Sequence, residues 1–166
     1  MSGMCNLLAR AAIGAVGGLA GTIALRGAMK AMDKMRSLAT APVVQEPGQF
    51  MVEQAERLLP ESARTRIPES AESAAAAMLG LGYGMSFGAL YAVLRPHGGN
   101  AFSDGMLLGA ACWAAGYLGW LPATGLMRPI WRQSAEQVAA PLAEHLLYGA
   151  ATVATYDALR LRNGSH

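Results

Sequence analysis

"GLGYGMSFG", residues 80–88, is the stretch of sequence that decides the predicted fold. It lies inside the uncharged run 74–94 and places Gly80, Gly84 and Gly88 four residues apart, on one face of a helix. Each such glycine destabilises a water-exposed helix by about 1 kcal/mol relative to alanine. In a lipid bilayer, small residues at this spacing stabilise helix pairs, because they let two backbones approach closely. The stretch therefore predicts a transmembrane helix that packs against another helix through its glycine face.

The composition also indicates a membrane protein. Only 14% of the 166 residues are charged and 53% are hydrophobic, whereas about 25% of residues are charged in typical soluble proteins. The 13 Lys and Arg residues barely exceed the 11 Asp and Glu residues, so no nucleic-acid partner is expected. Cys5 and Cys112 lie far apart and predict neither a disulfide framework nor a zinc site. We expect a single membrane domain over residues 1–166, surrounded by lipid.

Four segments are long and apolar enough to be considered as membrane spans. The uncharged runs 74–94 and 105–127 are the clearest, and the second is expected to end as a helix near Pro122, because proline suits the membrane interface. The segment between Arg10 and Arg26 is short, but it can span if both arginines extend outward. The sequence predicts an all-α integral membrane bundle of four transmembrane helices, at about residues 6–27, 74–94, 104–122 and 138–159.

Two of these segments need further comment. The first resembles a signal peptide, since Arg10 precedes an apolar stretch, but Arg26 and Lys30 spoil the expected small-residue cleavage site. The missing site favours a retained helix over a cleaved one. In the fourth segment, Pro141 is suited to begin the membrane helix, because proline is tolerated in a first helical turn.

The polar segment 28–73 is expected to be a loop between the first two spans. Within it, residues 48–59 place Met51, Ala55, Leu58 and Leu59 on one helical face. This pattern predicts a short amphipathic helix that lies on the membrane or on the bundle, in the first loop.

Basic residues set the expected orientation. With four spans, both termini and the 95–104 loop share one side of the membrane. That side carries few of the 13 basic residues, namely Arg10, Arg95, Arg160 and Arg162. Positive charge favours the cytoplasm, so both termini are expected in the periplasm if the protein lies in a bacterial inner membrane.

Small residues recur at the same spacing outside the 80–88 stretch. They are frequent in membrane helices in general, but their presence on all four segments favours a compact bundle. Alanines at 111 and 115 with Gly119, and alanines at 150, 154 and 158, extend the pattern. The glycines expected to pack helices are Gly14, Gly18, Gly17, Gly21, Gly80, Gly84, Gly88, Gly105 and Gly109.

Ionisable residues cluster in one apolar segment, "AEHLLYGAATVATYDAL", residues 143–159. Such residues inside a membrane are functional hypotheses, because their burial is costly. His145 has an ordinary pKa near neutrality, so it is a candidate to handle protons with Glu144. Tyr148 lies one turn from Glu144, and Asp157 completes the candidate set.

A structural interpretation of the same residues is favoured. If the helix begins at Pro141, Glu144 and His145 lie in its first turn at headgroup depth, where a carboxylate stabilises the helix end. Asp157 and Arg160 then form an interfacial pair at the other end. Aromatic residues near the predicted span ends are expected to be interfacial anchors: Tyr83, Tyr91, Trp120, Trp131 and Tyr156.

Motifs of soluble catalysis are missing from the sequence. There is no P-loop, dinucleotide fingerprint, HExxH or GxSxG, and the 80–88 stretch is preceded by no strand and followed by no lysine. His97, His145 and His166 offer no pair at a spacing suited to haem. We expect no enzymatic activity and no cofactor.

Short words in the terminal spans resemble the YagU-like family of small bacterial inner-membrane proteins, whose biochemical function is unknown. They are "HLLYG" at 145–149 and "GGLAGTIAL" at 17–25, which leads into "KAMDKM". The chain lacks a paired-proline motif after the first span, where "TAPVV" stands. The resemblance implies a bacterial inner membrane, a link to acid stress, and importance of His145 and Tyr148.

Two functions are considered. The first is a structural or accessory membrane protein, a homo-oligomer or a small subunit of a larger inner-membrane complex, packed through its glycine and alanine faces. The alternative is a small proton-coupled channel or transporter that uses His145 and Glu144.

Overall fold

The protein is helical throughout most of the computed structural model, which describes residues 2–33, 43, 45–95, 97 and 99–163. The expectation of an all-α fold is confirmed. The long helices are α1 (Ser2–Asp33), α4 (Glu69–Leu94), α5 (Ala101–Ala114) and α7 (Ala135–Asn163). A π-helical turn η1 (Ala115–Trp120) and α6 (Leu121–Ala123) continue α5, and the short elements are α2 (Pro47–Glu56), α3 (Glu61–Arg64) and the 3-10 turn η2 (Ile130–Arg132).

Three helical segments are long and apolar enough to cross a membrane: Asn6–Ala31, Glu69–Leu94 and Ala101–Ala123. They correspond to three of the four expected spans. The fourth expected span lies in α7, which has the necessary length, but Glu144 and His145 lower its mean hydropathy.

The helices on both sides of the polar segment 28–73 are longer than the sequence predicted. Helix α1 continues to Asp33, and α4 begins at Glu69, so the segment is not simply a loop. Pro68 stands at the N-cap of α4, and Glu69 and Glu72 occupy its first turn, where carboxylates favour the positive helix end. These local signals start the helix before the uncharged run.

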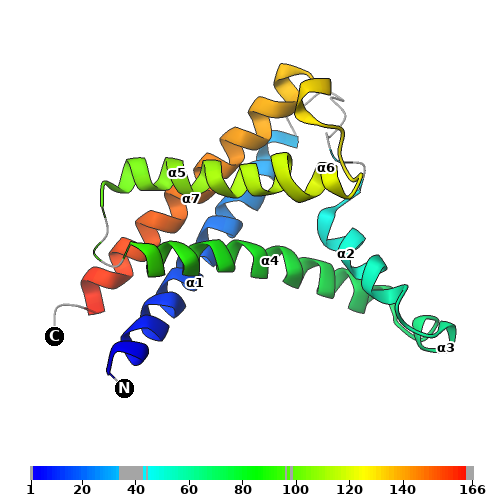
Figure 1. Cartoon of the computed structure of the whole chain (residues 1–166), viewed down its shortest axis with the longest axis horizontal. Coiled ribbons are helices and arrows are strands. Elements are labelled where there is room, and N and C mark those ends of the chain that lie inside the picture. Colours follow the sequence, from blue (N-terminus) through cyan, green and yellow to red (C-terminus); the bar gives the residue numbers. More distant parts are fainter. Residues whose placement is uncertain (1, 34–42, 44, 96, 98, 164–166) are drawn as a thin grey trace.

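The long helices form two crossing pairs (Figure 1). Helices α1 and α7 pack side by side, α4 crosses α1, and α5 crosses α7, whereas α4 and α5 contact each other little. Both termini and the loop between α4 and α5 lie at one end of the bundle, and α2 and α6 lie toward the other. The four long helices therefore run alternately away from the terminal end and back toward it.

Helix α2 packs against α4 through a face that the sequence did not predict. The expected apolar face is exposed: Met51 and Ala55 face outward, and Leu58, beyond the end of the helix, is 87% exposed. The contact is made instead by Gly48, because a Cβ there would lie 2.5 Å from the carbonyl oxygen of Ala76. Close backbone approach at Gly48 therefore positions α2 on α4, and Phe50, which lies outside the expected apolar face, packs against the buried cluster of Leu121, Leu126 and Met127.

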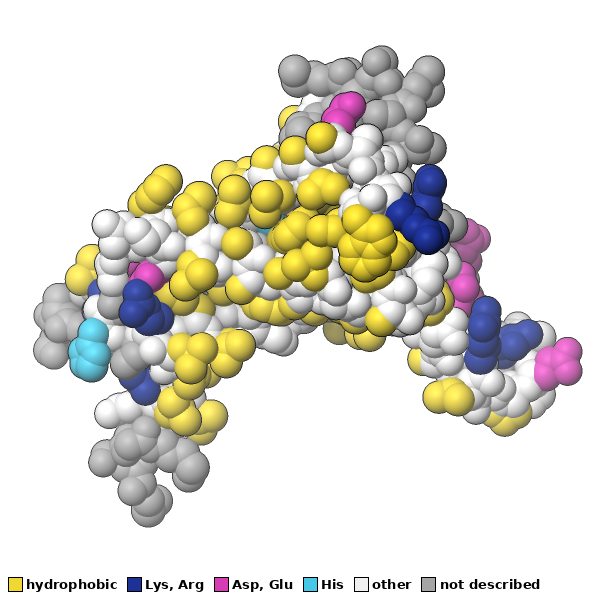
Figure 2. All heavy atoms as spheres, turned by 45° about the horizontal axis from the view of Figure 1, so that its top comes forward, with side chains coloured by type: hydrophobic (Ala, Val, Ile, Leu, Met, Phe, Trp, Pro, Cys, Tyr) yellow, Lys and Arg dark blue, Asp and Glu magenta, His cyan; other side chains and the backbone are white. Residues whose placement is uncertain are grey.

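Small residues lie inside the bundle and large apolar residues lie outside. The buried positions of α1 within residues 6–31 are Gly14, Gly17, Gly18, Gly21 and Thr22. Figure 2 shows hydrophobic side chains spread over the middle of the molecule, with charged side chains toward its ends. The exposed side chains include Leu8, Ile23, Met78, Leu90, Leu107 and Leu118.

Leucine at Gly84 is expected to destabilise the bundle, and leucine at Gly82 is the matched control. A Cβ on Gly84 would lie 3.4 Å from the carbonyl oxygen of Gly18 and collide with Thr22, whereas one on Gly82 meets nothing within 4 Å. We expect Gly84→Leu to lower the free energy of unfolding by about 1–3 kcal/mol, the usual effect of overpacking. Gly82→Leu should leave it unchanged or raise it, because leucine favours helix over glycine.

Denaturant unfolding of both variants in one detergent, followed by circular dichroism, measures the difference. Equal stability of the two variants would contradict the packing described above.

Candidate functional site

The crossing of α1 over α4 is made by backbone contact between two glycine pairs. A Cβ on Gly18 would lie 2.9 Å from the Cα of Met85, and one on Gly88 would lie 2.7 Å from the nitrogen of Gly18. Gly14 also lies directly against Gly88. No side chain fits at these positions, so the glycines set the distance between the helices.

The other glycine pair of α1 faces a different helix. A Cβ on Gly17 would lie 2.7 Å from the carbonyl oxygen of Thr152, and one on Gly21 would lie 2.6 Å from that of Tyr148. The two overlapping pairs of α1 thus contact α4 on one side and α7 on the other. This places α1 between α4 and α7.

The third close contact joins α5 to α7. Cβ atoms on Gly105 and Gly109 would lie 2.9 Å and 2.8 Å from the Cα atoms of Ala150 and Leu146. Gly149 completes the contact, because its Cβ would lie 2.5 Å from the nitrogen of Gly109.

The remaining predicted small residues do not join helices of the chain. Gly80 lies under the Arg26 side chain, because a Cβ on Gly80 would lie 2.8 Å from the Nη2 atom of Arg26. The other residues of the predicted stripes face outward, namely Ala111, Ala115, Gly119, Ala154 and Ala158. Spacing alone does not distinguish an inward from an outward small face.

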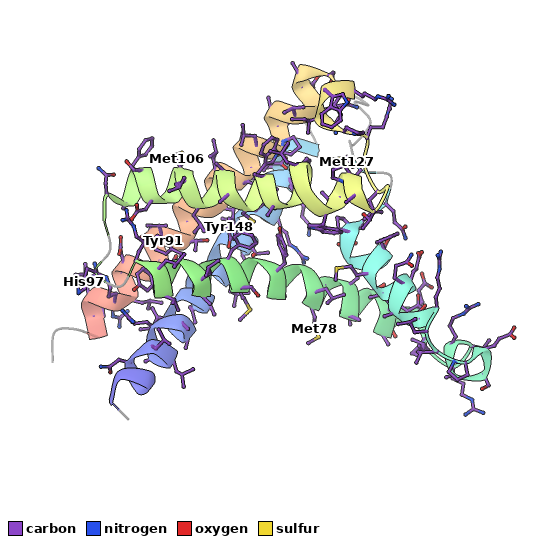
Figure 3. The ribbon with its side chains drawn as sticks, in the orientation of Figure 1. Met78, Tyr91, His97, Met106, Met127 and Tyr148 are labelled. Carbon is purple, nitrogen blue, oxygen red and sulfur yellow. The ribbon has the colours of Figure 1, made fainter. Side chains whose placement is uncertain are left out.

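Tyr148 ties three helices together where these contacts meet. It lies between α4 and α5 in Figure 3, and its buried hydroxyl donates a 2.6 Å hydrogen bond to the carbonyl oxygen of Gly84. Thr22 and Thr152 donate to the carbonyl oxygens one turn before them, of Gly18 and Tyr148, both at 2.8 Å. Each of these hydroxyls has its donor satisfied inside the bundle.

The expected start of the last helix at Pro141 was wrong. Helix α7 begins at Ala135, and Pro141 lies inside it. The reason is a capping box: Ser134 Oγ accepts from the nitrogen of Gln137 at 3.2 Å, and Gln137 Oε1 accepts from the nitrogen of Ser134 at 3.1 Å. Two satisfied backbone donors start the helix before the proline.

Glu144 and His145 therefore do not lie in a first helical turn. Glu144 is only 5% exposed, and His145 Nδ1 lies 2.7 Å from the carbonyl oxygen of Pro141. The His145 ring also packs edge-on against Tyr117, with ring centroids 5.7 Å apart. Both residues belong to the body of α7.

The structure does not bring Asp157 to the other three candidate proton-handling residues. Glu144, His145 and Tyr148 occupy neighbouring turns, whereas Asp157 lies toward the C-terminal end of α7. There Asp157 Oδ1 lies 3.5 Å from Arg160 Nη2, which confirms the predicted ion pair.

A polar cluster at the α4–α5 corner was missed by the sequence analysis. Asp104 is buried in the first turn of α5, and its Oδ1 accepts from Arg95 Nη2 at 2.5 Å. Its Oδ2 accepts from Arg95 Nε at 3.3 Å and from the Tyr91 hydroxyl at 3.1 Å. Gly99 leaves room for the Asp104 and Arg95 side chains, since a Cβ on Gly99 would lie 2.6 Å from Asp104 Oδ2. The Asp104 carboxylate raises the pKa of Arg95.

Two of the expected interfacial aromatics are instead core residues. Tyr91 and Tyr156 are buried and pack edge to face, with ring centroids 5.5 Å apart. Trp131 does face outward, at 80% exposure. Chain position near a span end therefore did not distinguish a lipid-facing aromatic from a core one.

No protein-family model matches the sequence, and no curated protein or solved structure matches it at a significant level. Within the part of the chain that the structure describes, no group of three His, Cys, Asp or Glu side chains is placed to hold a metal ion. The resemblance to YagU-like proteins stays a prediction.

Replacement of Asp104 tests the corner cluster. Asp104→Asn keeps the shape of the side chain but removes the buried carboxylate that accepts hydrogen bonds from Arg95 and Tyr91, and loss of a charged acceptor at a buried position is destabilising. We expect the unfolding temperature in detergent to fall by several degrees. The matched control is Asp157→Asn, because the Asp157 carboxylate is more exposed than that of Asp104 and its contact with Arg160 is long; this change should shift the unfolding temperature by at most about 2 °C. Equal shifts for the two variants would refute a structural role of the corner.

Proposed function

We propose that the protein is an integral membrane bundle of four transmembrane helices with a structural or accessory role. It acts as a homo-oligomer or as a small subunit of a larger membrane complex. The family resemblance favours a bacterial inner membrane, and the low number of basic residues at the terminal end favours periplasmic termini.

The observation that carries this proposal is that small residues lie inside the bundle and large apolar residues lie outside, the reverse of what is usual for a protein in water. Glycines fill the helix contacts, while large apolar side chains such as Met78 point away from the bundle (Figure 3). In water, such a chain would leave its apolar area exposed and gain little from burying glycine. In lipid, the same distribution is favourable, because close packing drives helix association and the outer side chains are already in an apolar medium.

The position of α7 supports a fourth span. It packs against both α1 and α5 along its length, and each of those helices is apolar enough to cross a membrane. A helix held between two spans by glycine contacts shares their depth. The exposed apolar face of α2, at Met51 and Ala55, suits the membrane surface beside the bundle.

Two features favour an accessory role over chemistry in the interior. The hydroxyls of Tyr148, Thr22 and Thr152 are consumed by hydrogen bonds that join or brace helices. Small residues also remain on the outside, at Ala115 on η1 and Ala154 on α7. An outward small face suits contact with a further helix, from a second copy or another subunit.

Mass measurement in mild detergent tests the accessory proposal. The protein should remain with membranes after an alkaline carbonate wash, and light scattering should give a mass above that of one chain, or a second protein should be recovered with it. Leucine at Gly82, Ala115 or Ala154 should lower the measured mass if that residue lies in the contact between subunits, and none of the three changes should lower the free energy of unfolding. A monomer recovered alone, and unaffected by all three changes, would refute this proposal.

Burial of Glu144 inside α7 favours proton coupling as a second candidate function, because an intramembrane carboxylate next to a histidine is a recurring element of proton pathways. Proteoliposomes under a pH gradient distinguish the two. Under the accessory proposal, proton flux equals that of protein-free liposomes, and His145→Ala leaves assembly intact. If the protein conducts protons, and His145→Ala abolishes this flux while Asp157→Asn does not, the second candidate function is established instead.

A further inference from the structure

The terminal ends of α1 and α7 hold buried hydrogen-bond donors that lack acceptors. Tyr156 is 0% exposed, and its hydroxyl has no hydrogen-bond partner among the described residues. The Nε atoms of Arg10 and Arg160 are likewise buried and without a partner there. Buried donors are normally paired, so three unpaired donors at one place indicate a missing acceptor.

The antiparallel packing of α1 and α7 brings these groups together. Gly21 lies against Tyr148 and Thr152, and Gly17, one turn earlier, lies against Thr152 and Tyr156. Continued for two more turns, this register places Arg10 beside Arg160. Both arginines and Asp157 lie within electrostatic range of the Tyr156 hydroxyl.

The local charges leave the cluster positive. Among the residues that the structure describes, Asp157 is the carboxylate that faces the cluster, and its contact with Arg160 is long, at 3.5 Å. The other nearby carboxylate, Asp104, is already bound by Arg95 and Tyr91. Two guanidinium groups therefore share one carboxylate. Since 32% of the Arg160 side chain is exposed, an acceptor can reach it from the surface.

The depth of the cluster identifies the acceptor. Arg10 lies near the start of the span Asn6–Ala31, where an arginine reaches the headgroup layer of the membrane. Phosphate groups are the acceptors at that depth, and guanidinium groups bind phosphate oxygens through paired hydrogen bonds.

We propose that Arg10 and Arg160, above the Tyr156 hydroxyl, bind the phosphodiester of an anionic phospholipid. The net positive charge of the cluster selects an anionic headgroup over a zwitterionic one. This site rests on the membrane insertion proposed above, and it gives the terminal face of the bundle a specific lipid partner.

Native mass spectrometry of the full chain in mild detergent tests the site, with phosphatidylglycerol or phosphatidylcholine added. The wild type should retain phosphatidylglycerol in preference to phosphatidylcholine. The double variant Arg10→Gln/Arg160→Gln should bind phosphatidylglycerol about tenfold more weakly, as expected when charge-assisted hydrogen bonds are lost. Arg132→Gln, in the exposed turn η2 at the other end, is the matched control and should bind as the wild type does.

Tyr156→Phe tests the same site without altering charge. Because the hydroxyl has no partner in the chain, its removal should leave the unfolding temperature in lipid-free detergent unchanged or higher. With phosphatidylglycerol present, the variant should gain less thermal stability than the wild type does. This variant decides the question if the double arginine variant does not fold.

Each outcome bears on one proposal. Unchanged phosphatidylglycerol binding by the double variant, or by Tyr156→Phe if the double variant does not fold, overturns the lipid site, even if the wild type stays in the membrane fraction. Displacement of the lipid by millimolar inorganic phosphate also overturns it, because the site then binds free phosphate. Absence of the wild type from the membrane fraction refutes the proposed function itself.

Discussion

Backbone contact between helices is the constraint on which the rest of the structure depends. At Gly18, Gly88 and Gly109 the neighbouring backbone occupies the space of a Cβ, so the crossing exists only with glycine. Lipid tails are as apolar as leucine, so apolar burial does little to hold helices together in a membrane. Dispersion contacts between closely spaced backbones must supply the attraction, and these require bare helix faces.

This constraint also explains the hydroxyls in the interior. Where two backbones approach closely, little room remains for bulky apolar side chains, and the spaces are filled by Thr22, Thr152 and Tyr148. Each hydroxyl must donate a hydrogen bond, because an unpaired donor costs about 1–3 kcal/mol in an apolar interior. The threonines donate to their own helices, but Tyr148 donates to Gly84 of α4, so the bond of Tyr148 links the two crossing pairs.

Helix faces, which follow from the spacing of residues, could be predicted from the sequence. Contacts between residues of different segments could not. The spacing of Gly84 and Gly88 identifies a shared helix face, but it says nothing about the partner, so the division of the α1 glycines between α4 and α7 was not predictable. Arg95 follows the end of α4 and Asp104 lies in α5, and no local pattern pairs them. The start of α7 was different, because the capping residues Ser134 and Gln137 are readable in the sequence and outweigh the proline.

The bundle therefore separates its polar groups into two kinds. Inside it, the Tyr148 hydroxyl is satisfied by a backbone carbonyl, and a satisfied group holds structure but offers nothing to a ligand. At the terminal end, Tyr156 and Arg160 keep donors without acceptors. Two glycines of α4 show the same contrast. The space beside Gly82 is open, whereas Thr22 and Gly18 fill the space beside Gly84. Because the chain fills the space at Gly84 but not at Gly82, and leaves Arg160 Nε without an acceptor, the interactions that give this protein its role are expected on its lipid-facing sides and at its terminal face.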